Sequence, residues 1–207
     1  FLKQHQVKAM VVACNTASAV ALDALKQHYA IPVLGVIEPG ARAAAQSTLS
    51  GKVALIGTEA TVKSRAYEKA LKSIKADLEI QSQACPLFVP LVEEGWNDHP
   101  ITEEVARIYL KGLKSQGVDT VILGCTHYPL LKTLLSRVLG TSIKLVDSAQ
   151  ESAMALQTLL KDKELLSLRK TLGSQSFYCS DAPEKMQSLG SAFLGKDLGK
   201  VEQVILD

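Results

Sequence analysis

Short apolar runs alternate along most of the chain with longer stretches of helical character. The apolar runs occupy residues 7–13, 32–37, 52–57, 119–123 and 142–146. The helical stretches occupy residues 16–29, 39–49, 61–74, 102–116, 128–139 and 148–160. Continuous Val, Ile and Leu, without intervening polar residues, is typical of strands that are buried on both faces of a parallel sheet. The alternation of strand and helix therefore predicts a doubly wound α/β fold, with mostly parallel sheets flanked by helices.

The placement of these elements predicts two similar lobes. We expect residues 40–142 to form the second lobe, and residues 1–39 together with 143–207 to form the first lobe. The chain starts abruptly with Phe1, Leu2 and Lys3, without an initiator Met. We therefore expect the natural protein to begin earlier, and the first lobe to be incomplete because its N-terminal strand is missing.

The composition of the 207-residue chain argues against several classes of protein. Hydrophobic residues make up 47% and charged residues 21%, and the net charge of +2 is spread without long runs of one sign, which gives no argument for nucleic acid or an anionic membrane as a partner. No apolar run approaches the ~20 residues of a membrane span, and we see no signal peptide. The cysteines are widely spaced, form no CxxC pair and predict free thiols in a cytosolic (cytoplasmic) protein. They are Cys14, Cys85, Cys125 and Cys179.

Two of the cysteines follow buried strands in similar local sequences. Cys14 precedes Asn15 and Thr16, and Cys125 precedes Thr126 and His127; each group lies between an apolar run and a helical stretch. Ligands of open α/β sheets bind outside the carboxyl ends of the strands, where the next helix offers unpaired N–H groups and the positive end of its dipole. We therefore expect the pKa of such thiols to lie below the reference value of about 8.5.

Two such thiols, facing each other in an active site between the lobes, could invert a carbon centre without a cofactor. One thiolate would remove a proton from a small anionic substrate, and the opposed thiol would return one from the other side. Asn15, Thr16, Thr126 and strand-end amides would bind the carboxylates. Donors aimed at the developing enolate oxygen would supply much of the stabilisation, and one such donor is typically worth about 3 kcal/mol.

Other interpretations of these residues stay open at this point. Free cysteine is among the most buried residue types, so either motif could be structural, as we expect for Cys85 and Cys179. His127 could be a loop partner, a residue that tunes the Cys125 thiol, or a carboxylate ligand. Cys14, Cys125 and His127 also offer zinc-ligand types, but they lack finger spacing and an evident fourth ligand. A Cys–His hydrolase would leave the Cys14 motif unexplained.

The segments around both cysteines resemble the paired signatures of glutamate racemases. These segments are ACNTASA at residues 13–19 and LGCTHYPLL at residues 123–131. Further similar segments are GVIEPG at 35–40, GTEATVKS at 57–64 with Tyr67 behind it, CPLFVPLVEEG at 85–95 and LVDS at 145–148. The resemblance covers roughly residues 7–153. Related aspartate racemases would carry Glu where His127 stands, which favours glutamate as the substrate.

The resemblance implies a cofactor-independent amino-acid racemase that interconverts L-glutamate and D-glutamate and supplies D-glutamate for bacterial peptidoglycan. It implies neither pyridoxal phosphate nor a metal, and a homodimer is the oligomeric state that we expect. Glu93 could equally be an acidic residue in the first turn of a helix, where the dipole favours it. The implied catalytic residues are Cys14 and Cys125, with His127 and Glu93 on the Cys125 side, and the implied substrate-binding residues are Asn15, Thr16, Thr58, Thr61, Thr126 and His127.

One departure from the family pattern concerns the start of the chain. Members carry an Asp-Ser-Gly motif at the end of their first strand and a Pro-Tyr-Gly motif after it, and neither precedes Cys14 here. The resemblance assigns support of the first cysteine and part of the substrate contacts to these motifs, so we expect this chain alone to be weakly active or inactive. Two other functions stay open: an isomerase of the same superfamily acting on aspartate, a hydantoin or another small acid, and a protein that only binds substrate.

Overall fold

The computed structural model describes residues 1–206, apart from the side chain of Lys114, and shows two compact units. The larger unit consists of residues 8–166, and the smaller unit combines residues 1–7 with the chain from residue 167 onward. The predicted α/β class, with parallel sheets flanked by helices, is confirmed. The predicted lobe boundaries, 1–39 with 143–207 and 40–142, stay a prediction, and their last residue, Asp207, lies outside the described residues.

Strands and helices alternate in the larger unit. Its strands are β1 (Met10–Val12), β2 (Val33–Gly35), β3 (Lys52–Gly57), β4 (Glu79–Ala84), β5 (Thr120–Gly124) and β6 (Lys144–Asp147). Its α-helices are α1 (Asn15–His28), α2 (Ile37–Ser47), α3 (Glu59–Ser64), α4 (Ala66–Ile74), α5 (Phe88–Glu93), α6 (Pro100–Leu110), α7 (Lys132–Leu139) and α8 (Ser148–Asp162). Short 3-10 helices are η2 (Lys114–Gln116) and η3 (Tyr128–Leu131).

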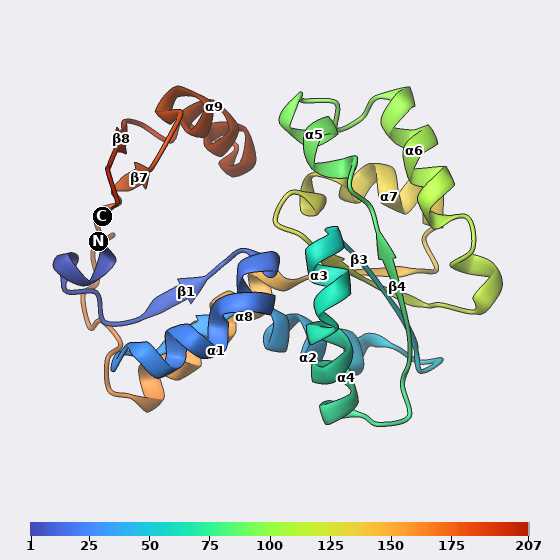
Figure 1. Ribbon diagram of the computed structural model, residues 1–207, viewed down its shortest axis with the longest axis horizontal. Helices are drawn as coiled ribbons and strands as arrows, with labels where there is room; N and C mark the ends of the chain where they lie inside the picture. Colours follow the sequence, from blue (N-terminus) through green and yellow to red (C-terminus); the bar gives the residue numbers. More distant parts are fainter. Residues whose placement is uncertain (207) are drawn as a thin grey trace. The chain divides into compact units, whose positions relative to one another are not determined.

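All strand pairs of the larger unit are parallel. β1 pairs with β2, and the other strands form a four-stranded sheet in the order β4-β3-β5-β6. Figure 1 shows β3 and β4 side by side in this sheet. Gly57 at the end of β3 pairs with both Ala84 and Gly124, so β3, β4 and β5 end at the same level. The segments that follow these strands therefore begin along one edge of the sheet.

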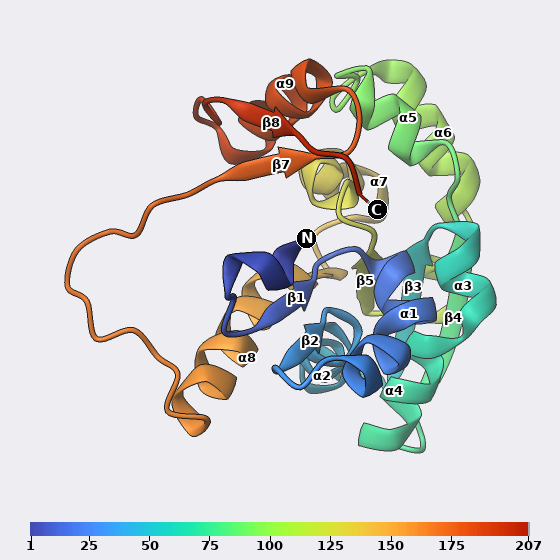
Figure 2. The same ribbon diagram turned by 60° about the vertical axis from the view of Figure 1, so that its left-hand side comes forward.

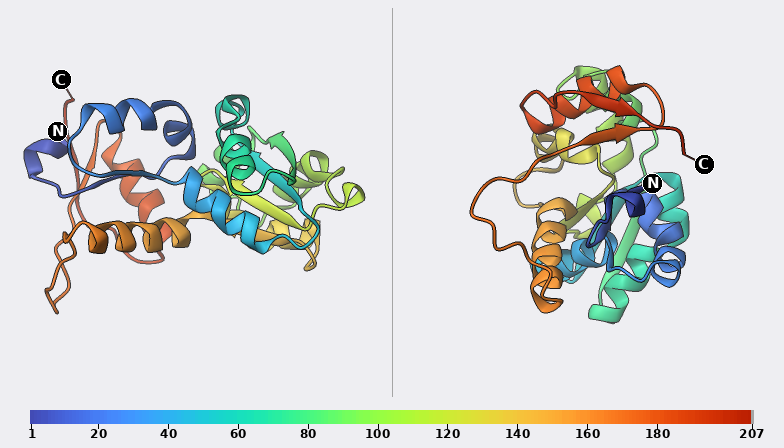
Figure 3. Two further views of the ribbon diagram at one scale, coloured as in Figure 1. Left: turned by 90° about the horizontal axis from the view of Figure 1, so that it is seen from below. Right: turned by 90° about the vertical axis from the view of Figure 1, so that its left-hand side faces the viewer.

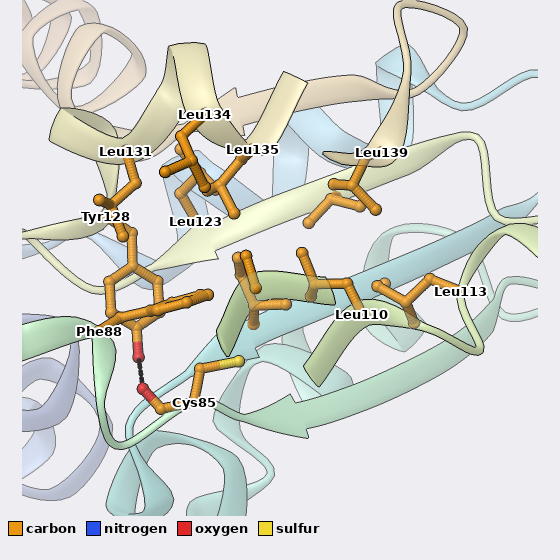
Figure 4. Packing of buried hydrophobic residues seen from close by; sticks show 14 of the residues in the cluster. Cys85, Phe88, Leu110, Leu113, Leu123, Tyr128, Leu131, Leu134, Leu135 and Leu139 are labelled. Carbon is orange, nitrogen blue, oxygen red and sulfur yellow. Dashed lines mark hydrogen bonds between the residues drawn. The ribbon is translucent and has the colours of Figure 1, made fainter. Parts of the chain in front are cut away.

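Alternate residues of the four-stranded sheet supply two separate cores. Leu55 and Ile122 pack with residues of α2 and α4 on one face. Ile56 and Leu123 pack with residues of α5, α6 and α7 on the other face, and Figure 4 shows Leu123 among the leucines of α7. Full burial of one such side chain stabilises a fold by about 1.5–3 kcal/mol. The two-sided burial explains why these strands consist of continuous apolar runs.

Several elements differ from the sequence predictions. The helix predicted at 61–74 is divided into α3 and α4 by Arg65, whose φ of 56° is left-handed. The helix predicted at 128–139 begins as the 3-10 turn η3, and the helix predicted at 102–116 ends at Leu110. Strand β4 was not predicted, because its sequence EIQSQA has no apolar run and lies at an edge of the sheet, where burial is incomplete.

The smaller unit contains a strand-helix-strand arrangement. Its elements are η1 (Leu2–His5), β7 (Phe177–Cys179), α9 (Pro183–Leu194) and β8 (Val201–Gln203). β7, which contains Cys179, and β8 are parallel and are connected through α9 (Figure 3). Residues 165–176, between α8 and β7, contain no helix or strand (Figure 2). Across residues 1–206, no helix combines the length and apolar composition that crossing a membrane requires.

Candidate active site

The residues predicted for the site follow the carboxyl ends of parallel strands in the larger unit. β1 ends just before Cys14, β3 ends directly before Thr58, and β5 ends directly before Cys125. Glu93 comes from α5, which follows β4. The rule that ligands of α/β sheets bind outside the carboxyl ends of strands therefore applies to the residues that follow β1, β3 and β5, whereas Glu93 is the last residue of a helix.

Cys14 is the N-cap residue of α1 and is exposed. Its Sγ accepts a hydrogen bond from the backbone N–H of Ala17 at 3.5 Å, as a side chain at the start of a helix does. Behind it, the Ser18 hydroxyl donates to the Val12 carbonyl at 2.7 Å and accepts from the Val36 N–H at 3.3 Å. These bonds attach the first turn of α1 to β1 and to the end of β2, so they fix the place of Cys14.

Cys125 lies at the end of β5, and its side chain is buried. The preceding Gly124 allows β5 to approach β3 closely. A Cβ atom at this position would lie 2.6 Å from Leu55 Cδ1 and 2.9 Å from the Ile56 carbonyl oxygen. Because a backbone oxygen within a sheet cannot move aside, a side chain at position 124 would displace Cys125.

Burial raises the pKa of the Cys125 thiol above its usual value. The negative charge of Cys14 as a thiolate raises this pKa further, whereas hydrogen bonds from the backbone N–H groups of His127 and Tyr128 and from the side chain of Thr126 lower it. Burial outweighs the helix-start donors, so the prediction of a lowered pKa is wrong for Cys125. The protonated thiol is the favoured form of Cys125.

His127 connects Cys125 with Glu93. The Nδ1 atom of His127 lies 3.8 Å from Cys125 Sγ and 3.4 Å from Thr126 Oγ1, and its Nε2 atom lies 3.3 Å from Glu93 Oε1. Glu93 is the last residue of α5, so the alternative that it is an acidic residue in the first turn of a helix is wrong. A proton on Nε2, directed at the carboxylate, leaves Nδ1 as the acceptor that faces the thiol.

Three of the four threonines predicted for the site form one hydrogen-bonded group. Thr16 Oγ1 lies 2.8 Å from Thr58 Oγ1 and 3.1 Å from Thr61 Oγ1, and Thr58 Oγ1 lies 3.0 Å from Thr61 Oγ1. Thr58 also caps α3 by accepting from the Thr61 N–H at 3.2 Å. Thr16 and Thr58 are half-buried, whereas Thr61 is 0% exposed. The group therefore joins the start of α1 to the start of α3.

Asn15, the first residue of α1, is buried and contacts α4. Its Oδ1 atom accepts a hydrogen bond of 2.6 Å from the hydroxyl group of Tyr67. Tyr67 lies behind a segment that resembles the racemases but was not predicted for the site, because the two partners are 52 positions apart in the chain.

A cavity of about 310 Å³ lies beside Cys125, at the lower end of the range for small-molecule sites. Asp147 and Ser148 line it together with Cys125 and Thr126. Asp147 caps α8 through the Ala149 N–H at 2.8 Å and forms an ion pair of 2.9 Å with Lys132. Asp147 and Ser148 were not predicted for the site, although Asp147 ends β6 and Ser148 directly follows it, as Cys125 follows β5.

The two remaining cysteines lie at other strands than Cys14 and Cys125. Cys85 is fully buried at the end of β4, and its carbonyl accepts a hydrogen bond from Tyr128 at 2.8 Å (Figure 4). Cys179 lies in β7 of the smaller unit. Across residues 1–206, no group of three or more His, Cys, Asp and Glu side chains is arranged to hold a metal ion.

Comparisons with known proteins identify the family to which the chain belongs. Residues 1–156 match the Asp/Glu/Hydantoin racemase family. The glutamate racemase of Geobacter metallireducens is 52% identical over 207 residues, which are 100% of this chain and 77% of that protein. The crystal structure of glutamate racemase isoform RacE1 from Bacillus anthracis matches with a TM-score of 0.94 at 39% identity and covers 100% of this chain and 77% of that chain. The structure of the Francisella tularensis glutamate racemase in complex with D-glutamate matches with a TM-score of 0.91 at 36% identity, over 100% of this chain and 77% of that chain.

The parallel α/β fold, with polar and thiol side chains at its strand ends, is thus that of an isomerase of the racemase class. The chain belongs to the Asp/Glu/hydantoin racemase family. Within that family, it is similar to the glutamate racemases.

Proposed function

We propose that this chain interconverts L-glutamate and D-glutamate by acid/base catalysis between Cys14 and Cys125. The observation that carries the proposal is the placement of the two thiols, Cys14 after β1 at the start of α1 and Cys125 directly after β5, where a negative charge on Cys14 raises the pKa of Cys125. Two thiols within electrostatic reach resist ionising together, so when one of them is a thiolate the other is kept as a protonated thiol. A racemase with two catalytic groups needs this combination at the start of each turnover, one group to accept a proton and one to donate.

The proton balance of the reaction follows from this pairing. The thiolate of Cys14 takes the proton from the α-carbon of glutamate, and the electron pair of the C–H bond moves toward the α-carboxylate. The Cys125 S–H bond then breaks as its proton goes to the opposite face of the α-carbon. The enzyme is left with a Cys14 thiol and a Cys125 thiolate, and either proton exchange with water or turnover of the other enantiomer, in the reverse direction, resets both groups.

The polar residues around the thiols would bind the two carboxylates of glutamate. We assign substrate contacts to Asn15, Thr16, Thr58 and Thr126, because hydroxyl and amide donors stabilise a carboxylate without adding a formal charge beside the thiolate. Thr61 is fully buried and hydrogen-bonded to Thr16 and Thr58, which supports a role through these two residues.

His127 and Glu93 would control the protonation of Cys125. A neutral His127 with its proton on Nε2 can accept the Cys125 S–H hydrogen bond at Nδ1, 3.8 Å away. The Glu93 carboxylate 3.3 Å from Nε2 stabilises that tautomer and would stabilise the imidazolium form if His127 took up the thiol proton. This arrangement would let Cys125 act as a base as well as an acid. We further propose that His127 contacts a substrate carboxylate.

The D-glutamate that this reaction produces would serve peptidoglycan synthesis, as the family resemblance implies. A cytosolic location and a homodimeric state stay predictions.

The proposal is tested by following the optical rotation of L-glutamate and of D-glutamate with the wild type, Cys14→Ser and Cys125→Ser. The Cys179→Ser variant, which alters a thiol of the smaller unit, is the matched control. We expect both site variants to lose at least about 100-fold in kcat in both directions and the control to keep its activity. The assay is run on this chain and on a version extended at its N-terminus. Near-wild-type turnover in either site variant contradicts the two-thiol mechanism. Faster turnover of aspartate than of glutamate contradicts the assignment of glutamate as the substrate.

A further inference from the structure

Asn15 holds a buried hydrogen bond that determines which atom of its amide can meet a ligand. The side chain is 2% exposed, and its Oδ1 accepts the hydroxyl proton of Tyr67 at 2.6 Å. Among the described residues, the Asn15 Nδ2 atom donates no hydrogen bond. It is also not one of the side-chain atoms that are both fully enclosed and without a partner, so part of its surface is accessible. The two Nδ2–H bonds of Asn15 are therefore available to a substrate.

The phenol of Tyr67 is closely surrounded at the point where several helices meet. Tyr67 comes from α4 and is 0% exposed. A Cβ atom added to Gly40 of α2 would lie 3.0 Å from the Tyr67 hydroxyl oxygen and 3.1 Å from Cβ of Ser148 at the start of α8. A side chain at position 40 would crowd the hydroxyl group, so Gly40 leaves it the room that it occupies beside Asn15.

The Tyr67 hydroxyl keeps its proton at physiological pH. Burial raises the pKa of this phenol far above its ordinary value, a hydrogen bond with Ser148 opposes the shift, and the negative charge of Asp147 adds to it. A protonated phenol both donates and accepts hydrogen bonds; here its one proton is directed at Asn15 Oδ1, and its oxygen remains for the bond with Ser148. In the structure Tyr67 is the donor of this bond and Asn15 Oδ1 is the acceptor.

We propose that Tyr67 is a positioning residue of the racemase site, which orients the Asn15 amide so that its nitrogen, and not its oxygen, is presented to a substrate carboxylate. The inference rests on the proposed function, in which Asn15 contacts glutamate. The two ends of an asparagine amide have the same shape and opposite hydrogen-bonding character. Without the Tyr67 donor, rotation about the last torsion of Asn15 exchanges a donor for an oxygen that repels the carboxylate.

The effect of this positioning should appear in substrate binding more than in the chemical step. A carboxylate contact that is present in the ground state and in the transition state lowers KM and leaves kcat nearly unchanged. Loss of the Tyr67 hydroxyl should therefore raise KM for both enantiomers by about 10-fold, which corresponds to about 1.4 kcal/mol of binding free energy. We expect kcat to change by less than about 3-fold. A purely structural role would not produce this division between KM and kcat.

A double-mutant cycle tests the inference. KM and kcat are measured for the wild type, Tyr67→Phe, Asn15→Ala and the double variant at a temperature where all four are folded, and the dissociation constant of D-glutamate is measured by calorimetry. Tyr109→Phe, which removes a tyrosine hydroxyl that accepts a 3.4 Å bond from the Leu87 N–H, is the control. We expect each single site variant to raise KM and the double variant to resemble Asn15→Ala, because Tyr67 acts only through Asn15.

The outcomes separate the inference from the proposed function. Effects of Tyr67→Phe and Asn15→Ala that multiply in the double variant overturn the positioning role, as does an unchanged KM in Tyr67→Phe beside an active wild type. A wild type that neither binds nor racemises glutamate, including its N-terminally extended form, overturns the proposed function itself and the inference with it.

Discussion

Glu93 Oε1 lies 3.3 Å from Nε2 of His127, whose Nδ1 faces Cys125 Sγ at 3.8 Å. The carboxylate comes from the end of α5, which follows β4, and the imidazole from the segment after β5, so two parallel strands with β3 between them supply the two groups that act on the Cys125 thiol. The Glu93 carboxylate acts on the Cys125 thiol only through the His127 imidazole. Removing the carboxylate therefore tests whether this group takes part in proton transfer.

The Glu93→Gln variant should lower kcat by about 10- to 100-fold with little change in KM. A hydrogen bond to a charged group contributes roughly 1.5–3 kcal/mol, and here the contribution grows as His127 gains a proton. Steady-state kinetics in both directions check this expectation. Glu94→Gln, which changes the exposed neighbouring residue, should behave like the wild type. An unchanged kcat in Glu93→Gln would show that Glu93 does not act on the reaction.

The Gly124→Ala variant should lose stability and activity together. The added Cβ would meet the Ile56 carbonyl oxygen at 2.9 Å, and overpacking of this kind typically costs about 1–3 kcal/mol. Because the strain lies next to Cys125, we expect kcat to fall even at temperatures where the variant is fully folded. Thermal unfolding and kinetics measure the two effects. Gly173→Ala meets nothing within 4 Å and is the control. Wild-type stability in Gly124→Ala would contradict the close approach of β5 to β3.

Thr58 should contribute to both helix capping and substrate binding. Thr58→Val removes the cap of α3 and the bond to Thr16, so the free energy of unfolding should fall by about 1 kcal/mol and KM for glutamate should rise several-fold. Thr58→Ser keeps the hydroxyl group and should restore most of both properties. Denaturant unfolding measures the change in stability, and steady-state kinetics measure the change in KM. Equal behaviour of the two variants would show that the Thr58 hydroxyl group contributes to neither property.

The stability of the larger unit should decrease in alkali because of Cys85. Burial raises the pKa of this thiol from 9.0 to about 12. Because the thiol holds its proton more tightly in the folded state, it stabilises that state at pH values below the pKa of the unfolded chain. This stabilisation is lost as pH rises from about 9 to about 12, and the total loss is roughly 4 kcal/mol. The free energy of unfolding of Cys85→Ala should depend less steeply on pH in this window than that of the wild type. Parallel curves for the two proteins would contradict the burial effect.

The sequence predicted the parallel strands well because their burial on both faces leaves a continuous apolar pattern. It failed at β4, whose residues at an edge of the sheet do not need to be apolar, and at Arg65, where a single left-handed residue divides a helix. Neither feature changes the local composition enough to be recognised. The breaks arise from tertiary packing, which overrides local propensity.

The site was predicted in part for similar reasons. Cys14, Thr58 and Cys125 follow strand ends, and that position could be recognised from the chain alone or through the resemblance. The pKa of Cys125 could not be predicted, because it depends on how deeply the end of β5 is buried. The contact of Tyr67 with Asn15 joins distant parts of the chain, and only the fold reveals it.

The central claim is that two different thiols handle the proton on the two faces of the α-carbon. The most direct test follows L-glutamate in heavy water by NMR during the first few per cent of turnover, with this chain and its N-terminally extended form. If the donor thiol carries a proton from solvent, the first D-glutamate should contain deuterium at the α-carbon, while the remaining L-glutamate keeps its original hydrogen. Product that retains the substrate's hydrogen, or deuterium that enters substrate and product equally from the start, would indicate a single proton-transfer group and contradict the account.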